Sequence, residues 1–258
     1  SYRAGQGVDP VVAVQPTGRP HDAGRNGPRP EPRRGQRARR TGRSHRRQSL
    51  TSPLTKWLGR AQRTCVAKLY FYYASMNAGK STTLLQADFN YRERGMDTML
   101  WTAAIDNRYD TGAISSRIGL RADAHMFAPE TDLWADVNAE AAQRSLACVL
   151  VDEAQFLSRD QVLQLARLAD EANIPVVAYG LRTDFQGELF PGSAALLGIA
   201  DNLIELKGVC DCGRKATMNL RVDEFGEAVV DGAQTEIGGD DRYVAMCRKH
   251  FNEARAGR

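Results

Sequence analysis

The sequence contains no long apolar run. No stretch approaches the ~20 apolar residues of a membrane-spanning helix, and no apolar core of about 7–15 residues marks a signal peptide. The chain does not begin with Met and its first methionine is Met76, so a start assigned too far upstream would explain the segment before it. We therefore expect a soluble, cytoplasmic protein with no membrane partner.

Residues 1–66 have almost no aliphatic clusters and are strongly basic. They hold fourteen Arg and one Lys against three acidic residues, a net charge of about +12. Since the whole chain carries +4, residues 67–258 must carry about −8. So few apolar groups cannot offset the conformational entropy that is lost on ordering a chain, and we predict that residues 1–66 are disordered.

An arginine-rich arm for nucleic acid is the functional alternative for residues 1–66. Arms that hold single strands interleave basic residues with aromatic side chains on which bases stack. Only Tyr2 and Trp57 are available here, so nucleic-acid binding by this segment is the weaker interpretation.

A phosphate-binding loop is the clearest motif. The run Lys68–Tyr73 predicts a strand, and Ser81–Arg94 predicts a helix directly after Ala78-Gly79-Lys80-Ser81. Backbone N–H groups at the start of such a helix surround phosphate groups. Lys80 then reaches the β- and γ-oxygens, and the Ser81 hydroxyl binds Mg²⁺. A chance match in a strand–helix turn is the alternative.

Two adjacent acids follow a second apolar run, about seventy residues further on. Cys148–Asp152 is typical of a central parallel strand, and ligands of such sheets bind beyond the carboxyl ends of the strands. We expect Asp152 beside the phosphate loop as the acidic partner of Mg²⁺, and Glu153 facing a second substrate as proton acceptor. The alternative is that these acids only cap the helix that begins near Ser158.

Strand and helix patterns alternate through residues 67–206. Further strands are expected at Thr98–Ala103, Ile174–Tyr179 and Leu203–Leu206, helices at Leu133–Ser145 and Ser158–Ala172, and a loop at Asn107–Leu120. Repeated βα units imply parallel strands with right-handed crossovers. The fold class is therefore α/β, with a parallel-sheet nucleotide-binding domain at 67–206 and a segment of different character at 207–258.

Two short metal-type knuckles lie about 35 residues apart in the segment 207–258. Their ligands are Cys210, Cys212, Cys247 and His250. Three thiolates and one imidazole suit tetrahedral Zn²⁺, and four protein ligands leave no open position, so the zinc would be structural. Disulfides are the alternative, which a reducing cytosol disfavours. Between the knuckles Lys215–Val230 alternates like a hairpin, which would make a zinc-stapled substrate lid.

Four motifs together resemble one family. They are Asn77–Ser81, Val151–Phe156, Tyr179–Phe185, and Ile237-Gly238-Gly239 with Tyr243. In this order, and with the two knuckles, they are similar to thymidine kinases of the cytosolic, zinc-containing type, in their bacterial branch. The resemblance spans Lys68 to about Phe251. It implies a RecA-like P-loop domain, a small zinc-containing lasso domain over thymidine, and a homotetramer that makes dTMP from thymidine and ATP.

The resemblance also implies site residues. Glu153 corresponds to the general base of the family, and main-chain groups of the lasso read the edge of the base. The ATP and Mg²⁺ set falls on Ala74, Ser75, Met76, Asn77, Ala78, Gly79, Lys80, Ser81, Asp152, Glu153, Ala154, Gln155 and Arg108, the last of which shares an Asp-x-Arg loop with Asp106. The thymidine pocket falls on Met76, Phe156, Leu181, Phe185, Phe190 and Tyr243, and structural zinc on Cys210, Cys212, Cys247 and His250.

The sequence departs from the family pattern in two places. Many members have Gly where this chain has Ala74, and Ala fits only if that residue needs no positive φ. Residues 1–66 match nothing in the family, and the resemblance gives them no role.

Two other classes compete with a kinase. An ATP-hydrolysing motor or switch shares an acid motif like Asp-Glu-Ala-Gln, but it usually needs a second RecA-like domain, for which about 190 residues leave no room. A nucleic-acid-binding module without turnover would use the Arg-rich segment and the knuckles. It would show salt-dependent affinity for DNA and no nucleoside phosphorylation. The four motifs in order favour the kinase.

Overall fold

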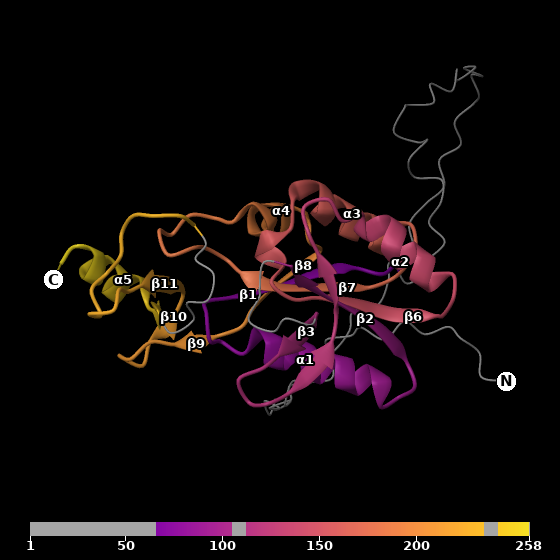
Figure 1. Cartoon of the computed structure of the whole chain (residues 1–258), viewed down its shortest axis with the longest axis horizontal. Coiled ribbons are helices and arrows are strands. Elements are labelled where there is room, and N and C mark those ends of the chain that lie inside the picture. Colours follow the sequence, from indigo (N-terminus) through magenta and orange to yellow (C-terminus); the bar gives the residue numbers. More distant parts are fainter. Residues whose placement is uncertain (1–65, 105–111, 235–241, 258) are drawn as a thin grey trace, which may run out of the picture. The chain divides into compact units, whose positions relative to one another are not determined.

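A six-stranded parallel sheet lies at the centre of the part of the chain that the computed structural model describes, residues 66–104, 112–234 and 242–257 (Figure 1). In spatial order the strands are β5 (His125–Phe127), β2 (Asp97–Ala103), β6 (Leu146–Val151), β7 (Val176–Leu181), β1 (Leu69–Ala74) and β8 (Asn202–Glu205). Every neighbouring pair is parallel. The apolar runs of β1, β6 and β7 are almost entirely buried, as in a sheet covered on both faces.

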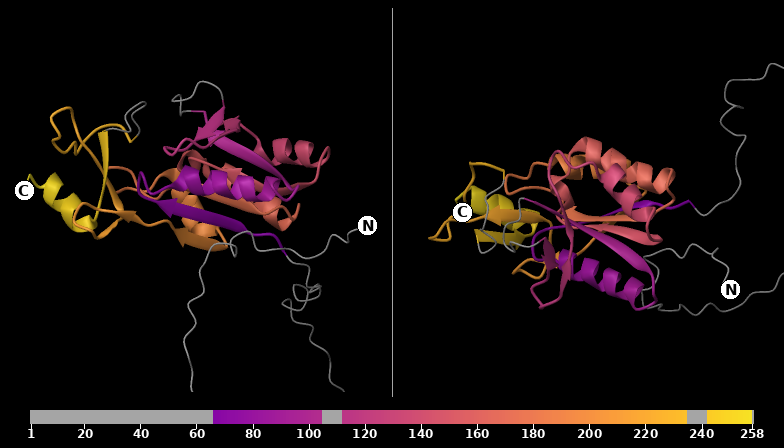
Figure 2. Two further views of the ribbon diagram at one scale, coloured as in Figure 1. Left: turned by 90° about the horizontal axis from the view of Figure 1, so that it is seen from below. Right: turned by 45° about the vertical axis from the view of Figure 1, so that its right-hand side comes forward.

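Helices cover both faces of this sheet (Figures 1 and 2). One face carries α1 (Lys80–Arg92), and the other carries α2 (Leu133–Ala141), α3 (Arg159–Asp170) and α4 (Pro191–Ile199). Helix α3 begins with a capping box, in which the Ser158 hydroxyl accepts from Gln161 N and the Gln161 side chain accepts from Ser158 N. Its apolar side chains, Val162, Leu165 and Leu168, are fully buried in the core beneath it.

The C-terminal segment is built from short strands and one helix. Strand β9 (Gly208–Val209) pairs with β10 (Lys215–Ala216), and β11 (Met218–Arg221) pairs with β12 (Tyr243–Met246), both antiparallel. Helix α5 (Arg248–Arg255) follows. A separate hairpin joins β3 (Ala113–Ser115) to β4 (Arg121–Asp123). Within the described ranges, no helix has both the length and the apolar character needed to cross a bilayer.

The α/β architecture and the parallel sheet are confirmed, and the sequence located five of the six strands. It missed β5, α4 and α5. The predicted hairpin over Lys215–Val230 is largely wrong, because β10 and β11 pair with β9 and β12; only a turn closed by a Val222–Ala228 bridge remains. The alternation of polar and apolar residues predicts strands but not which strands pair, so it could not show that the partner of β11 lies beyond residue 241. The predicted loop at Asn107–Leu120 contains β3 after residue 111.

Candidate active site

The phosphate loop joins β1 to α1, where the sequence predicted it. Gly79 is the N-cap of α1 with φ 83°, and Asn77 also has a positive φ of 59°. Ala74 is instead the last residue of β1, paired in register with Leu181 of β7. Its backbone is extended and needs no glycine, so Ala at this position fits the loop.

Lys80, Ser81 and Asp152 meet at the carboxyl ends of β1 and β6. Lys80 is buried, and its Nζ donates to Ser75 O at 3.2 Å. Asp152 is only 3% exposed, and the Ser81 side chain hydrogen-bonds to it. Burial, and then the charge of Glu153, raise the pKa of Asp152 to about 7 against the opposing effects of Ser81 and Lys80. A carboxylate and a hydroxyl are oxygen ligands that suit Mg²⁺, and such a cation would stabilise the ionised carboxylate.

Glu153 has an unusual backbone conformation. Its φ of 51° and ψ of 35° lie in the left-handed region, which residues other than glycine rarely adopt. Its N–H donates to Asp152 Oδ1 at 3.0 Å, and its Oε2 accepts from Gln155 Nε2. Strained residues of this kind cluster at functional sites. Because Ser158 caps α3, the alternative that the acid pair merely caps this helix has no support.

The residues expected in the thymidine pocket fall into contacting groups. The rings of Phe156, in η2 (Ala154–Phe156), and Phe190 meet edge to face with centroids 5.8 Å apart. Phe185 is 1% exposed and lies under the Arg221 guanidinium, 3.8 Å from its ring centroid. Tyr243 is the partner of Arg221 in the β11–β12 register. Phe185 and Tyr243 therefore share a neighbour, Arg221, which the sequence did not single out.

Asn219 is a second residue that the sequence did not single out. It is 2% exposed on β11; its Oδ1 accepts from Met76 N at 2.7 Å and its Nδ2 donates to Thr183 O at 2.9 Å. The peptide group that supplies the Met76 N–H also supplies Ser75 O, the acceptor of Lys80. The C-terminal segment thus holds the phosphate loop directly. No motif marks Asn219, and only the alternation around it hints at a strand.

Asn219→Leu is expected to raise the KM for ATP about tenfold, because the partly buried Met76 N–H loses its acceptor, at a cost of about 1–3 kcal/mol. Steady-state kinetics at saturating thymidine measure this change. Leu220→Ala is the matched control, since Leu220 is 3% exposed on the same strand but its side chain lies on the other face. It should lower thermal stability and leave the KM for ATP unchanged. An equal rise in both variants would contradict a specific role of Asn219.

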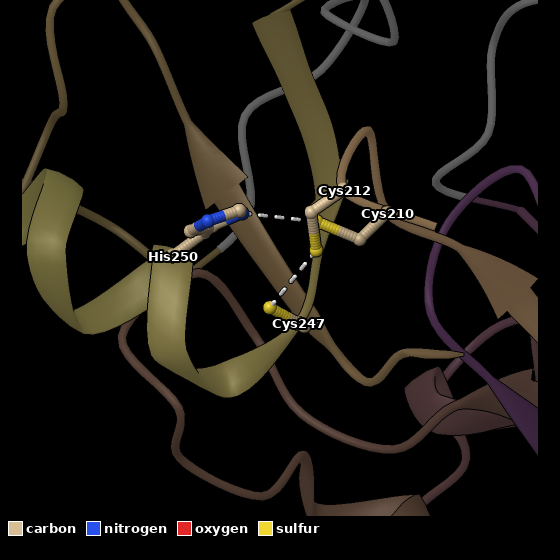
Figure 3. A group of neighbouring side chains, drawn as sticks. All are labelled: Cys210, Cys212, Cys247 and His250. Carbon is tan, nitrogen blue, oxygen red and sulfur yellow. Dashed lines mark hydrogen bonds between the residues drawn. The ribbon is translucent and has the colours of Figure 1, made fainter. Parts of the chain in front are cut away.

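The predicted metal ligands come together in the C-terminal segment (Figure 3). Their ligand atoms all lie within 4.8 Å of one another, in the set Cys210, Cys212, Cys247 and His250. The Cys212 and Cys247 sulfurs are 3.8 Å apart, and Cys210 Sγ lies 3.4 Å from His250 Nδ1. Zn–S bonds of about 2.3 Å at tetrahedral angles put two thiolates about 3.8 Å apart, so the cluster has the dimensions of a zinc site.

The pKa values of two thiols in the cluster shift in opposite directions. Hydrogen bonds from the Cys212 and Cys247 backbone, and from His250, lower the pKa of Cys210 to about 6, which favours the thiolate that binds metals. Against a hydrogen bond from the Arg214 backbone, desolvation and the neighbouring Cys210 and Cys247 side chains raise the pKa of Cys212. His250 Nε2 lies 3.9 Å from Glu253 Oε2, which is too far for a hydrogen bond. The four cysteines in the described residues are free, so the disulfide alternative has no support there.

Several predicted features lie outside the described residues. They are residues 1–65, Asp106 and Arg108, and the Ile237-Gly238-Gly239 motif. The prediction of disorder for the basic segment and the ATP contact of Arg108 therefore stay predictions.

The parallel sheet, the phosphate loop after β1 and the acid pair after β6 define a P-loop nucleotide-binding protein of the α/β class. A family model described as thymidine kinase matches residues 67–251. The chain belongs to the thymidine kinase family.

Curated relatives agree with the family model. A thymidine kinase of Novosphingobium aromaticivorans is 76% identical over 189 residues, which cover 73% of this chain and 98% of that protein. A thymidine kinase of Zymomonas mobilis is 63% identical over 188 residues, 73% of this chain and 97% of that protein. A thymidine kinase of Photobacterium profundum is 58% identical over 189 residues, which cover 73% of this chain and 98% of that protein.

Proposed function

We propose that this chain transfers the γ-phosphoryl group of ATP to the 5′-hydroxyl of thymidine and releases dTMP and ADP. The observation that carries the proposal is the meeting of Lys80, Ser81 and Asp152 beside Glu153, in a chain of the thymidine kinase family. Phosphoryl transfer requires positioning and neutralisation of charge more than covalent catalysis. These four residues supply the groups that such a reaction needs.

In this proposal the loop holds ATP. Main-chain N–H groups of residues 74–81 surround the phosphates, and the Lys80 ammonium moves from Ser75 O to the β- and γ-oxygens. Ser81 and Asp152 would hold Mg²⁺, which when bound neutralises charge on the phosphates. Ala154 and Arg108 complete the proposed ATP site; Gln155, which the resemblance also places there, acts in this proposal through its hydrogen bond to Glu153 and not through contact with ATP.

Glu153 is the proposed proton acceptor. As the 5′-oxygen of thymidine attacks the γ-phosphorus, the bond to ADP breaks and the hydroxyl proton passes to the Glu153 carboxylate. The nucleoside would lie among the residues implied by the resemblance, which are Met76, Phe156, Leu181, Phe185, Phe190 and Tyr243.

The remaining parts of the proposal concern organisation. Residues 67–206 form the P-loop domain, and residues 207–258 form the zinc-binding lasso. Zinc on Cys210, Cys212, Cys247 and His250 is structural, because all four positions of a tetrahedral ion are filled by protein. A homotetramer in the cytoplasm, which the family resemblance implies, completes the proposal.

A substrate panel tests the proposed activity. The full chain is incubated with ATP, Mg²⁺ and each deoxynucleoside in turn, and ADP release is followed. We expect release with thymidine far above that with the purine deoxynucleosides. ADP release that is independent of any nucleoside would support an ATP-hydrolysing switch instead, and salt-dependent DNA binding without ADP release would support a nucleic-acid module.

Deletion of residues 1–66 is expected to leave thymidine kinase turnover within about twofold and the melting temperature within about 2 °C. The family match covers residues 67–251, and the basic segment has few apolar groups with which to stabilise a core. Turnover and thermal unfolding of the full and the shortened chain measure this. A large loss of either quantity would show that the segment docks on the domain.

A further inference from the structure

One buried amide connects Glu153 to the neighbouring strand. Gln155, in η2, is 1% exposed. Its Nε2 donates to Glu153 Oε2, and its Oε1 accepts from Leu181 N at 3.0 Å. Because β6 precedes Glu153 and β7 ends at Leu181, and these strands are neighbours in the sheet, the amide links the carboxyl ends of two parallel strands.

The space for this amide depends on Gly180. A Cβ at residue 180 would lie 3.0 Å from both Gln155 N and Gln155 Oε1. The backbone of Gly180 is not in the left-handed region, so a need for positive φ does not explain the glycine. Close approach to Gln155 does explain it. The Tyr179-Gly180-Leu181 sequence is thus fitted to the side chain of Gln155.

We propose that Gln155 is a positioning residue for phosphoryl transfer, which fixes the Glu153 carboxylate relative to the nucleoside. The proposal rests on the proposed function, in which Glu153 accepts the 5′-hydroxyl proton. The terminal torsion of a glutamate is broad, so a carboxylate has little orientation of its own. The hydrogen bond from Gln155 Nε2 to Glu153 Oε2 restricts this torsion and so fixes the plane of the carboxylate.

The second hydrogen bond of Gln155 sets the distance to the substrate. Leu181 is one of the residues expected around thymidine, and its N–H is the group that Gln155 Oε1 accepts from. The buried amide of Gln155 therefore holds the Glu153 carboxylate at a fixed position relative to the end of β7, where the proposed thymidine pocket lies. A misplacement of about 1 Å in such a geometry costs about 10²-fold in rate. Loss of the amide should act on kcat and leave ATP binding almost unchanged.

Gln155→Met in the full chain tests the proposal, because Met keeps the length and removes both hydrogen bonds. We expect kcat to fall about 10–100-fold, with the KM for ATP within about twofold. Gln161→Met is the matched control. Gln161 is 2% exposed and its amide makes three hydrogen bonds outside the site, to Ser158 N, Ala128 O and Thr131 O. It should lower the melting temperature but keep kcat within about threefold.

A double-mutant cycle separates positioning from structural support. In a Glu153→Gln background the proton acceptor is already lost. Adding Gln155→Met to this background should therefore lower kcat by less than about threefold. Gly180→Ala gives an independent route, since its Cβ would lie 3.0 Å from both the main-chain N and the Oε1 of Gln155 and so shifts this residue without removing its amide. We expect a smaller fall in kcat for Gly180→Ala, again only when Glu153 is present; this variant also serves if Gln155→Met does not fold.

The outcomes distinguish the positioning role of Gln155 from the proposed thymidine kinase function. Equal losses in both backgrounds, or a loss matched by Gln161→Met, would make Gln155 purely structural. Unchanged kcat for Gln155→Met and Gly180→Ala would overturn the positioning role alone. Near-normal turnover of Glu153→Gln would overturn the positioning role together with the base. A wild-type chain that phosphorylates no nucleoside would overturn the proposed function itself.

Discussion

Glu153→Gln is expected to lower the turnover of thymidine by about 10²–10⁴-fold, the range typical of a lost general base. The substitution keeps the size of the side chain but removes the carboxylate that accepts the 5′-hydroxyl proton. The left-handed backbone of Glu153 and its hydrogen bond from Gln155 place this carboxylate at the end of β6. Turnover at saturating ATP and thymidine measures the effect.

Two controls accompany the Glu153 variant. Calorimetry should show that thymidine and ATP still bind, since the change removes a proton acceptor and not a binding surface. Glu171→Gln should leave turnover unchanged, because Glu171 lies exposed at the end of α3, where it forms an ion pair with Arg167. Near-normal turnover of Glu153→Gln would remove Glu153 from its role.

Cys247→Ser is expected to abolish zinc binding and to raise the KM for thymidine about tenfold or more. A hydroxyl does not replace the thiolate, and metal affinity appears as folding free energy in a segment that the metal closes. Strand β12 leads directly into Cys247 and carries Tyr243, and its partner β11 carries Asn219. Loosening of this pair should therefore weaken ATP binding as well, through the Asn219–Met76 hydrogen bond.

Metal analysis accompanies the kinetics of the Cys247 variant. The wild-type chain should hold about one zinc, the single tetrahedral site that four ligands build. Cys148→Ala is the control, because burial raises the pKa of the Cys148 thiol to about 12 and keeps it out of metal chemistry. It should retain the full zinc content. A fully active chain purified without zinc, with the four ligand side chains open to chemical modification, contradicts the structural role.

The sequence was informative wherever chemistry depends on residues close together along the chain. The phosphate loop, the acid pair and each metal knuckle span a few residues, and their spacing alone predicts a strand end or a tight turn. Patterns of this kind located Lys80, Asp152 and Glu153 correctly at one edge of the sheet. The joining of the two knuckles into one cluster also followed, because only a complete tetrahedron satisfies the metal.

The sequence was uninformative where function depends on long-range contacts. The Asn219–Met76 hydrogen bond joins residues 143 positions apart, and the Gln155–Leu181 bond joins residues 26 apart. Neither pair has a recognisable spacing, since the fold alone brings the partners together. The short strand β5 was missed for a similar reason: it holds three residues, and pairing with β2 rather than local propensity forms it.

The fate of the γ-phosphoryl group tests the central claim most directly. The full chain is incubated with γ-labelled ATP, Mg²⁺ and thymidine, and the labelled product is identified by mass spectrometry and by comparison with authentic dTMP. We expect label on the 5′-oxygen of thymidine, with one dTMP formed for each ADP, and almost none of either product from Glu153→Gln. Label released only as inorganic phosphate, or thymidine recovered unchanged, would contradict the assignment of this site as a thymidine kinase.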